Sequence, residues 1–229
     1  MEDRRIYLWD LPTRLFHWML VAAVIGAVVT GLQGGAMMDW HARFGLSIVG
    51  LLVFRLVWGF AGSTYARFVQ FFPTPRKIAV YFRGGWDGHG HSPVGALSAL
   101  SLLAVLTVQV ATGLVGNDDI TFSGPLSDLV TKRFSDRMTG IHQLLANGIY
   151  VLVALHVGAI LYYQTFQKKG LLRPMITGWK AGDPGDSARG GGLMAFGFAL
   201  IVASAAVYGA SGAWLPAPPP PVAGETPNF

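Results

Sequence analysis

The chain has 229 residues, of which 52% are hydrophobic and 13% are charged, and its formal net charge is +5. Soluble domains carry about 25% charged residues, and half that fraction leaves too few charges to solvate the surface of a globule of this size. A soluble single domain, a disordered chain and a nucleic-acid-binding protein are therefore disfavoured. The sequence has no cysteine, which excludes disulfides, thiolate metal sites, cysteine nucleophiles and covalent c-type haem.

Five apolar runs are long enough to cross a bilayer as helices, which takes about 20 residues. In chain order they cover residues 15–32, 44–60, 94–115, 141–166 and 193–214. They predict an all-α integral membrane bundle. The first run follows basic residues as a signal peptide would, but it is longer than the usual apolar segment and has a histidine near its start. We therefore expect it to be a retained helix.

The basic residues predict how these helices cross the membrane. Lysine and arginine concentrate before the first run, between the second and third, and between the fourth and fifth. The segments on the opposite side hold few of them, and an excess of basic residues marks the cytoplasmic side of membrane proteins. We therefore expect the N-terminus in the cytoplasm and the C-terminus outside.

The segments outside the runs carry patterns of their own. Residues 68–86 mix aromatic and basic side chains with two prolines, which predicts a short amphipathic helix along the cytoplasmic interface. Residues 117–137 form the largest outer loop, with four aspartates and three basic residues. The tail 216–229 has five prolines in its first six positions and cannot be helical. We predict a four-helix membrane domain at 1–180, and a fifth helix with this external tail at 181–229.

Four of the six histidines lie in or at the ends of the runs. A titratable ring inside the membrane is costly and so is a candidate for function, although any single one is more often a satisfied interhelical hydrogen bond. His142 and His156 are 14 residues apart, which puts their rings on nearly the same helix face, about 21 Å apart along the axis. With the direction deduced above, His41 shares the outer level with His142, and His17 shares the inner level with His156.

Two facing imidazoles at each of two depths favour b-type haem over zinc. Zinc takes four ligands, and no cysteine or carboxylate accompanies these pairs, whereas histidine is a common axial ligand of haem iron. We therefore predict two haems with bis-histidine iron. The four ligands to the metal are His17, His41, His142 and His156. The candidate partners for haem propionates are Arg14 and Arg55 inside, and Arg43, Lys132 and Arg137 outside, although topology and snorkelling explain these residues equally well.

The other two histidines, His89 and His91, lie in the turn 88–93 before the third run. Glycine and proline predict a surface turn there, in which solvated imidazoles are the more common outcome. The alternative is a contact with protons or quinone near the inner haem.

Several segments resemble the prokaryotic cytochrome b561 family, which includes the b-type subunits of nickel–iron hydrogenases. They are WDLPTRLFHW, HARFG, FRLVWGF, GHSPVGALS, TGIHQLLAN and ALHVGAIL, and they cover most of residues 7–180. The resemblance implies a four-helix bundle in a bacterial inner membrane, with two b haems that exchange electrons between membrane quinone and a redox partner. Residues 117–132 are similar to family members that serve c-type cytochromes. The fifth run departs from the family's four-helix core.

Three functions remain open from the sequence. The leading one is electron transfer between quinone and a periplasmic partner, either a c-type cytochrome or a hydrogenase-like complex that the chain anchors. The second is a quinone reductase that acts directly on a small substrate such as superoxide. The third is a transporter or proton channel without redox chemistry. For the leading function we expect the partner on residues 117–137 and 34–39, and quinone at the inner haem near residues 68–86.

Overall fold

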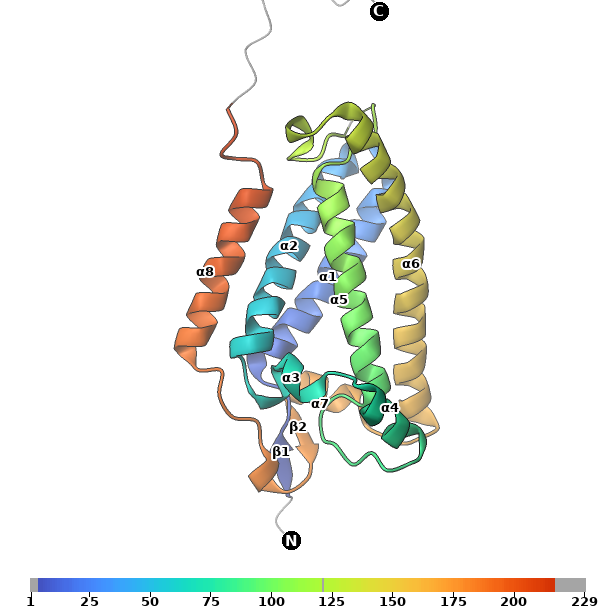
Figure 1. Ribbon diagram of the computed structural model, residues 1–229, viewed down its shortest axis with the longest axis vertical. Helices are drawn as coiled ribbons and strands as arrows, with labels where there is room; N and C mark the ends of the chain where they lie inside the picture. Colours follow the sequence, from blue (N-terminus) through green and yellow to red (C-terminus); the bar gives the residue numbers. More distant parts are fainter. Residues whose placement is uncertain (1–3, 121, 217–229) are drawn as a thin grey trace, which may run out of the picture.

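The structure is a computed structural model that describes residues 4–120 and 122–216, so most of the predicted proline-rich tail lies outside the described residues. Within them, five helices are long and apolar enough to cross a membrane (Figure 1). They are α1 (Leu11–Gln33), α2 (Met38–Ala61), α5 (Pro93–Leu114), α6 (Lys132–Thr165) and α8 (Leu193–Ala210). The all-α membrane bundle predicted from the sequence is confirmed.

Two of the membrane-spanning helices, α1 and α5, begin with the same local signal, a polar capping residue followed by a proline in the first turn. Asp10 accepts a hydrogen bond from the backbone N–H of Thr13 at 2.6 Å at the start of α1. Ser92 accepts one from the N–H of Gly95 at 3.2 Å at the start of α5. Such caps satisfy backbone donors that a helix leaves free at its first turn, and proline fits there because it lacks an N–H.

Two helix ends differ from the predicted runs. The helix α6 begins at Lys132 rather than near residue 141, and its first turn is polar and carries an ion pair of 3.0 Å between Lys132 and Asp136. Charged pairs four residues apart support a helix outside the membrane, and a search for apolar runs cannot detect such a turn. The helix α8 ends at Ala210 rather than at Trp214, because Gly212 adopts a positive φ of 66°.

The bundle consists of two helix pairs and one added helix (Figure 1). The helix α1 packs along α2 and α5 packs along α6, whereas the two pairs meet mainly through α2 and α5. The helix α8 packs on α2, and the small side chains Ala199 and Ala203 lie buried in a cluster with Phe54 and Trp58. Small residues allow such close helix contact in membranes. The fifth helix, α8, therefore packs on the outside of the two pairs and not between them.

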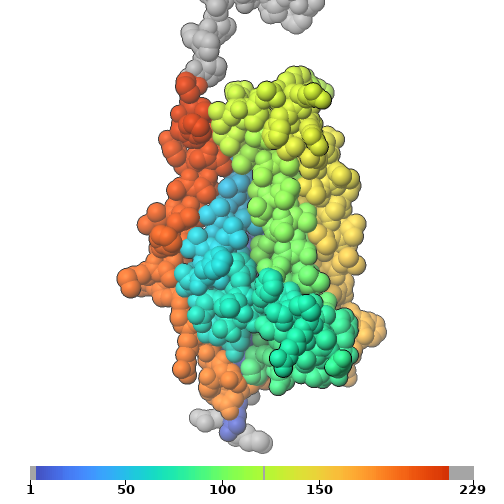
Figure 2. Space-filling model, viewed as in Figure 1, coloured from blue at the N-terminus to red at the C-terminus, as the bar shows by residue number. Residues whose placement is uncertain are grey.

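Short elements close the end of the bundle where the chain begins, which we call the cap end. They are α3 (Phe68–Phe71), α4 (Pro75–Phe82), α7 (Leu172–Thr177), and the antiparallel strands β1 (Arg5–Tyr7) and β2 (Trp179–Ala181). Figure 2 shows α3 and α4 covering the lower part of the bundle. The amphipathic helix predicted over residues 68–86 is thus two short helices, because Pro73 interrupts it. The opposite end, closed by residues 115–131, is the loop end.

Candidate functional site: two pairs of histidines

At the loop end, the rings of His41 on α2 and His142 on α6 face each other. Their centroids lie 6.1 Å apart and their planes are inclined by 79°. A metal ion that is bound by two imidazole nitrogens at about 2 Å each holds the ring centroids about 6 Å apart. The spacing of the two rings therefore fits a shared iron atom.

Both of these rings are held by a backbone carbonyl of the preceding helix. His41 Nδ1 lies 2.8 Å from the carbonyl oxygen of Ala27, and His142 Nδ1 lies 2.9 Å from that of Gln109. A carbonyl oxygen can only accept, so each ring carries its proton on Nδ1 and keeps the lone pair of Nε2. Metal-binding histidines have this arrangement, which fixes the ring and raises its basicity.

A cavity of about 420 Å³ surrounds the two rings, and residues from α1, α2, α5 and α6 line it. Binding pockets for small molecules and cofactors span about 300–1,000 Å³ and are mostly apolar. The lining here is mostly apolar too, with Gly45 and Ala146 among its small residues. Phe122 of the outer loop closes it, with its ring edge-on to His41 at 6.4 Å. Size and lining suit a large, flat, apolar cofactor.

At the cap end, His17 on α1 and His156 on α6 lie close enough to interact electrostatically. The hydroxyl of Ser98 lies 3.2 Å from His156 Nδ1, and a hydroxyl can either donate or accept. The Nδ1 atom of His17 is buried and has no hydrogen-bond partner among the described residues. The four predicted ligands thus lie two at each end of the bundle, with a ring contact between the two at the loop end and only electrostatic proximity between the two at the cap end.

Arg55 lies in the half of α2 toward the cap end and is only 5% exposed. Its guanidinium lies 4.7 Å from the ring centre of Phe68 and 5.8 Å from that of Phe71. Its Nη1 atom is buried without a hydrogen-bond partner in the described part of the chain. A buried charge is costly unless it is paired. The carboxylate of Asp10 lies within electrostatic range of Arg55, and the Nη1 atom, without a hydrogen-bond partner among the described residues, fits a further anionic group such as a haem propionate.

The other predicted basic partners are arranged differently. Arg14 donates from Nη1 to the carbonyl of Ile176 at 2.6 Å, and its Nε is buried without a partner in the residues described. Arg43 lies over the ring of Trp40 at 4.8 Å. Lys132 is bound to carboxylates of the outer loop, and Arg137 is exposed. Among the five candidates, Arg55 therefore has the environment that most requires an anion.

His89 and His91 have separate surroundings. His89 Nε2 lies 3.0 Å from a carboxylate oxygen of Asp186 at the surface, as expected for a solvated imidazole. The ring of His91 instead packs against Trp9 and Phe71, each at 4.7 Å, and its Nδ1 is buried. Burial, and secondarily the charge of Arg55, lowers the pKa of His91 to about 3. The expectation of solvent exposure was wrong for His91. Trp9 and Phe71, which cover its ring, are far from it in the sequence, so no local pattern indicates the contact.

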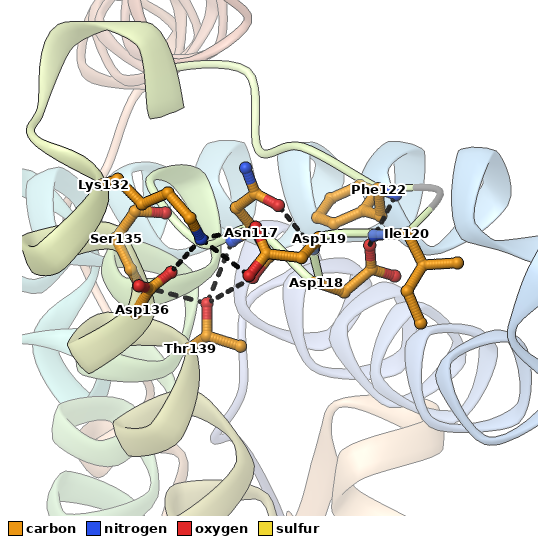
Figure 3. A network of polar contacts seen from close by, with 9 residues as sticks. All are labelled: Asn117, Asp118, Asp119, Ile120, Phe122, Lys132, Ser135, Asp136 and Thr139. Carbon is orange, nitrogen blue, oxygen red and sulfur yellow. Dashed lines mark hydrogen bonds and ion pairs between the residues drawn. The ribbon is translucent and has the colours of Figure 1, made fainter. Parts of the chain in front are cut away.

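The outer loop is fixed by internal polar contacts rather than left free (Figure 3). Lys132 Nζ lies 2.6 Å from a carboxylate oxygen of Asp119 and 3.0 Å from one of Asp136. The hydroxyl of Thr139 accepts from the N–H of Asn117 at 2.9 Å and lies 3.1 Å from its carbonyl oxygen. The loop is therefore tied to the first turns of α6.

The tip of this loop carries an apolar side chain close to the outer histidines. Asp118 accepts hydrogen bonds from the N–H groups of Ile120 at 2.9 Å and Phe122 at 2.8 Å. Phe122 thereby stays against His41, while Ile120 is 87% exposed. Several charges expected to attract a partner thus also shape the loop, and the docking of a partner here stays a prediction.

Comparison with known proteins identifies the family of the chain. The family model described as prokaryotic cytochrome b561 matches residues 8–178, a range that contains all four paired histidines. Two relatives carry the name probable Ni/Fe-hydrogenase B-type cytochrome subunit, one from Azotobacter vinelandii and one from Azotobacter chroococcum mcd 1. Each is 23% identical, over 219 and 217 residues respectively, and each alignment covers 78% of this chain and 90% of the relative. No solved structure matches at a significant level.

Proposed function

Because this chain belongs to the prokaryotic cytochrome b561 family, we propose that it carries electrons through two b-type haems between membrane quinone and a redox partner. Membership makes the protein a membrane b-type cytochrome, and haem supplies one-electron chemistry when it is bound. The observation that carries the proposal is the meeting of His41 with His142 across a cavity, with both Nε2 atoms free to bind iron.

The residues of the chain take distinct parts in this proposal. His41 and His142 hold the outer haem, and His17 and His156 hold the inner one. Arg55 pairs with a propionate of the inner haem, because its buried Nη1 has no other partner in the described residues. Arg14 is a second candidate through its buried Nε. The apolar side chains between the helix pairs exclude water from both haems.

The cap end is proposed to face the cytoplasm of a bacterium, with the protein in its inner membrane. The support is the excess of lysine and arginine in the segments that form this end, since cytoplasmic loops carry such an excess. The N-terminus is then cytoplasmic, and the chain beyond α8 emerges on the periplasmic side.

A periplasmic redox protein is proposed to exchange electrons at the loop end. Ile120 offers it an exposed apolar contact, and Phe122 on the same loop lies edge-on to His41. The names of the two Azotobacter relatives favour a hydrogenase-type partner, whereas the similarity of residues 117–132 favours a c-type cytochrome. The two are distinguished by which purified protein, a hydrogenase or a c-type cytochrome, exchanges electrons with the outer haem.

Quinone is proposed to bind at the cap end, on the inner haem. The helices α3 and α4 supply exposed apolar side chains there, including Phe72 and Phe82. His89 lies at the surface, where it can exchange protons with water, whereas the ring of His91 packs against Trp9 and Phe71 at the same end. Quinol-driven haem reduction in His89→Ala and His91→Ala tests these roles. Wild-type rates in both variants at full haem content would remove the two histidines from the proposal.

The central test is the haem content of the purified protein. A pyridine haemochrome assay is expected to give two b haems per chain, and a dithionite-reduced spectrum is expected to resolve both. A stoichiometry of one, or a protein without haem, would contradict the two-haem proposal. Full reduction by a small substrate without any partner protein would instead favour the enzyme that the sequence left open.

A further inference from the structure

The two histidines at the loop end are held by the same device, although they belong to different helix pairs. In each pair, the imidazole reaches from the second helix to the first, where it meets a carbonyl and, one turn later, a glycine. A ring thus lies over a glycine and bonds to the carbonyl four residues before it. The residues involved are Ala27 and Gly31 for His41, and Gln109 and Gly113 for His142.

Each glycine is needed because the ring occupies the space of a side chain. A Cβ atom on Gly31 would lie 2.9 Å from His41 Nδ1 and 3.0 Å from its Cε1. A Cβ atom on Gly113 would lie 2.9 Å from His142 Cε1 and 3.1 Å from its Nδ1. Contacts this short are repulsive, because non-bonded atoms pack best at about 3.5–4.0 Å. A methyl group at either position would therefore move the imidazole away from its carbonyl.

We propose that Gly31 and Gly113 are positioning residues of the outer haem, which set the orientation and the proton position of its two axial histidines. The inference rests on the proposed function, since it takes iron to lie between the two rings. The glycines admit each ring to its carbonyl, which keeps the proton on Nδ1. Together they hold the ring planes crossed at 79°.

Two properties of the outer haem follow from this geometry. A hydrogen bond from Nδ1 to a carbonyl raises the basicity of Nε2, which favours ferric over ferrous iron and lowers the reduction potential. Crossed ring planes give ferric haem a strongly anisotropic low-spin EPR signal, because neither of the two iron d orbitals that face the ligands is favoured. The inner pair has no such carbonyl contacts among the described residues, so neither property is expected to depend on these glycines there.

The experiment compares Gly31→Ala and Gly113→Ala with Gly148→Ala, a control on α6 whose added Cβ meets nothing within 4 Å. Each variant is purified with its haems, and haem content, midpoint potentials and EPR spectra are measured. The outer haem is identified as the one that His41→Ala removes. We expect the midpoint potential of the outer haem to rise by about 59 mV, which corresponds to a tenfold change in the equilibrium constant for one-electron reduction. Its EPR anisotropy should fall, while the inner haem and the control stay unchanged.

The outcomes separate this inference from the function on which it rests. A wild-type protein without haem would refute the proposed function. Two haems with an unchanged outer potential and EPR signal in both glycine variants would refute the inference alone. Loss of both haems, or an equal shift in Gly148→Ala, would also refute it, because the added methyl groups touch the outer rings. Selective loss of the outer haem would support it.

Discussion

At the loop end both histidines bond to backbone carbonyls, whereas at the cap end His156 meets the hydroxyl of Ser98 and His17 Nδ1 has no partner among the described residues. The loop-end rings have a fixed proton position. The cap end instead gathers polar atoms that still need a partner. The same residue type thus occurs in a preorganised pair at one end and in an open pair at the other. The difference teaches that the hydrogen bond made by the Nδ1 atom of a histidine, more than the position of that histidine in a helix, indicates whether its ring is already oriented to bind a metal.

The largest effect that tests this comparison is the loss of one haem at a time. We expect His142→Ala to remove the outer haem and His156→Ala the inner one, since each variant deletes one axial ligand. The double variant His41→Ala/His142→Ala should lose no more haem than either single change. Haem content and reduced spectra provide the measurement. If His17→Ala and His41→Ala removed the same spectral component, the assignment of ligands to two ends would be wrong.

A substitution of Arg55 tests whether the cap end binds an anionic group. The change Arg55→Leu should weaken binding of the inner haem by roughly thirtyfold or more, because truncating one member of a buried charge pair costs about 2–5 kcal/mol. Transfer of haem to apomyoglobin measures the release from each site. The matched control is Arg133→Leu, whose side chain is exposed at the other end. Equal haem release from Arg55→Leu and the wild type would exclude a propionate contact.

Ser98 offers a smaller change at the same end. Ser98→Ala removes the hydroxyl 3.2 Å from His156 Nδ1 and should raise the inner midpoint potential. The shift should be less than the roughly tenfold change expected from a lost carbonyl bond, because the hydroxyl contact is longer. Ser98→Thr keeps the hydroxyl and should restore the wild-type value. Redox titration decides the matter, and a shift of the outer haem instead would show that the two ends are not independent.

The smallest expected effect concerns the charges of the loop end. Reduction of a periplasmic partner should slow as ionic strength rises, and charge reversal in Asp118→Lys and Asp119→Lys should alter that dependence, since exposed charges steer association. Asp183→Lys makes the same change of charge at the cap end and serves as the control. Stopped-flow rates that ignore both salt and the loop variants would indicate a loop that merely joins two helices.

The spans, and the end of the bundle at which each of the four histidines lies, were accessible from the sequence, because apolar length and helical rise are local properties. Hydropathy could not find the first turns of α6, where Lys132 and Asp136 support the helix in water. It also could not find the three-residue strands β1 and β2, which pair with each other although all four core helices lie between them in the sequence. The burial of His91 and the carbonyl partners of His41 depend on packing between helices, so no local pattern indicates them.

The pairing of β1 with β2 has a consequence for the order in which the protein matures. The strand Arg5–Tyr7 is synthesised first, yet its partner ends at Ala181, after all four core helices. The loop end is tied much earlier, when Thr139 meets Asn117. At about 5–20 residues per second, translation from Thr139 to Ala181 takes roughly 2–8 s. During that interval the residues that tie the loop end have already been synthesised, while the cap end still lacks the second strand of its pair.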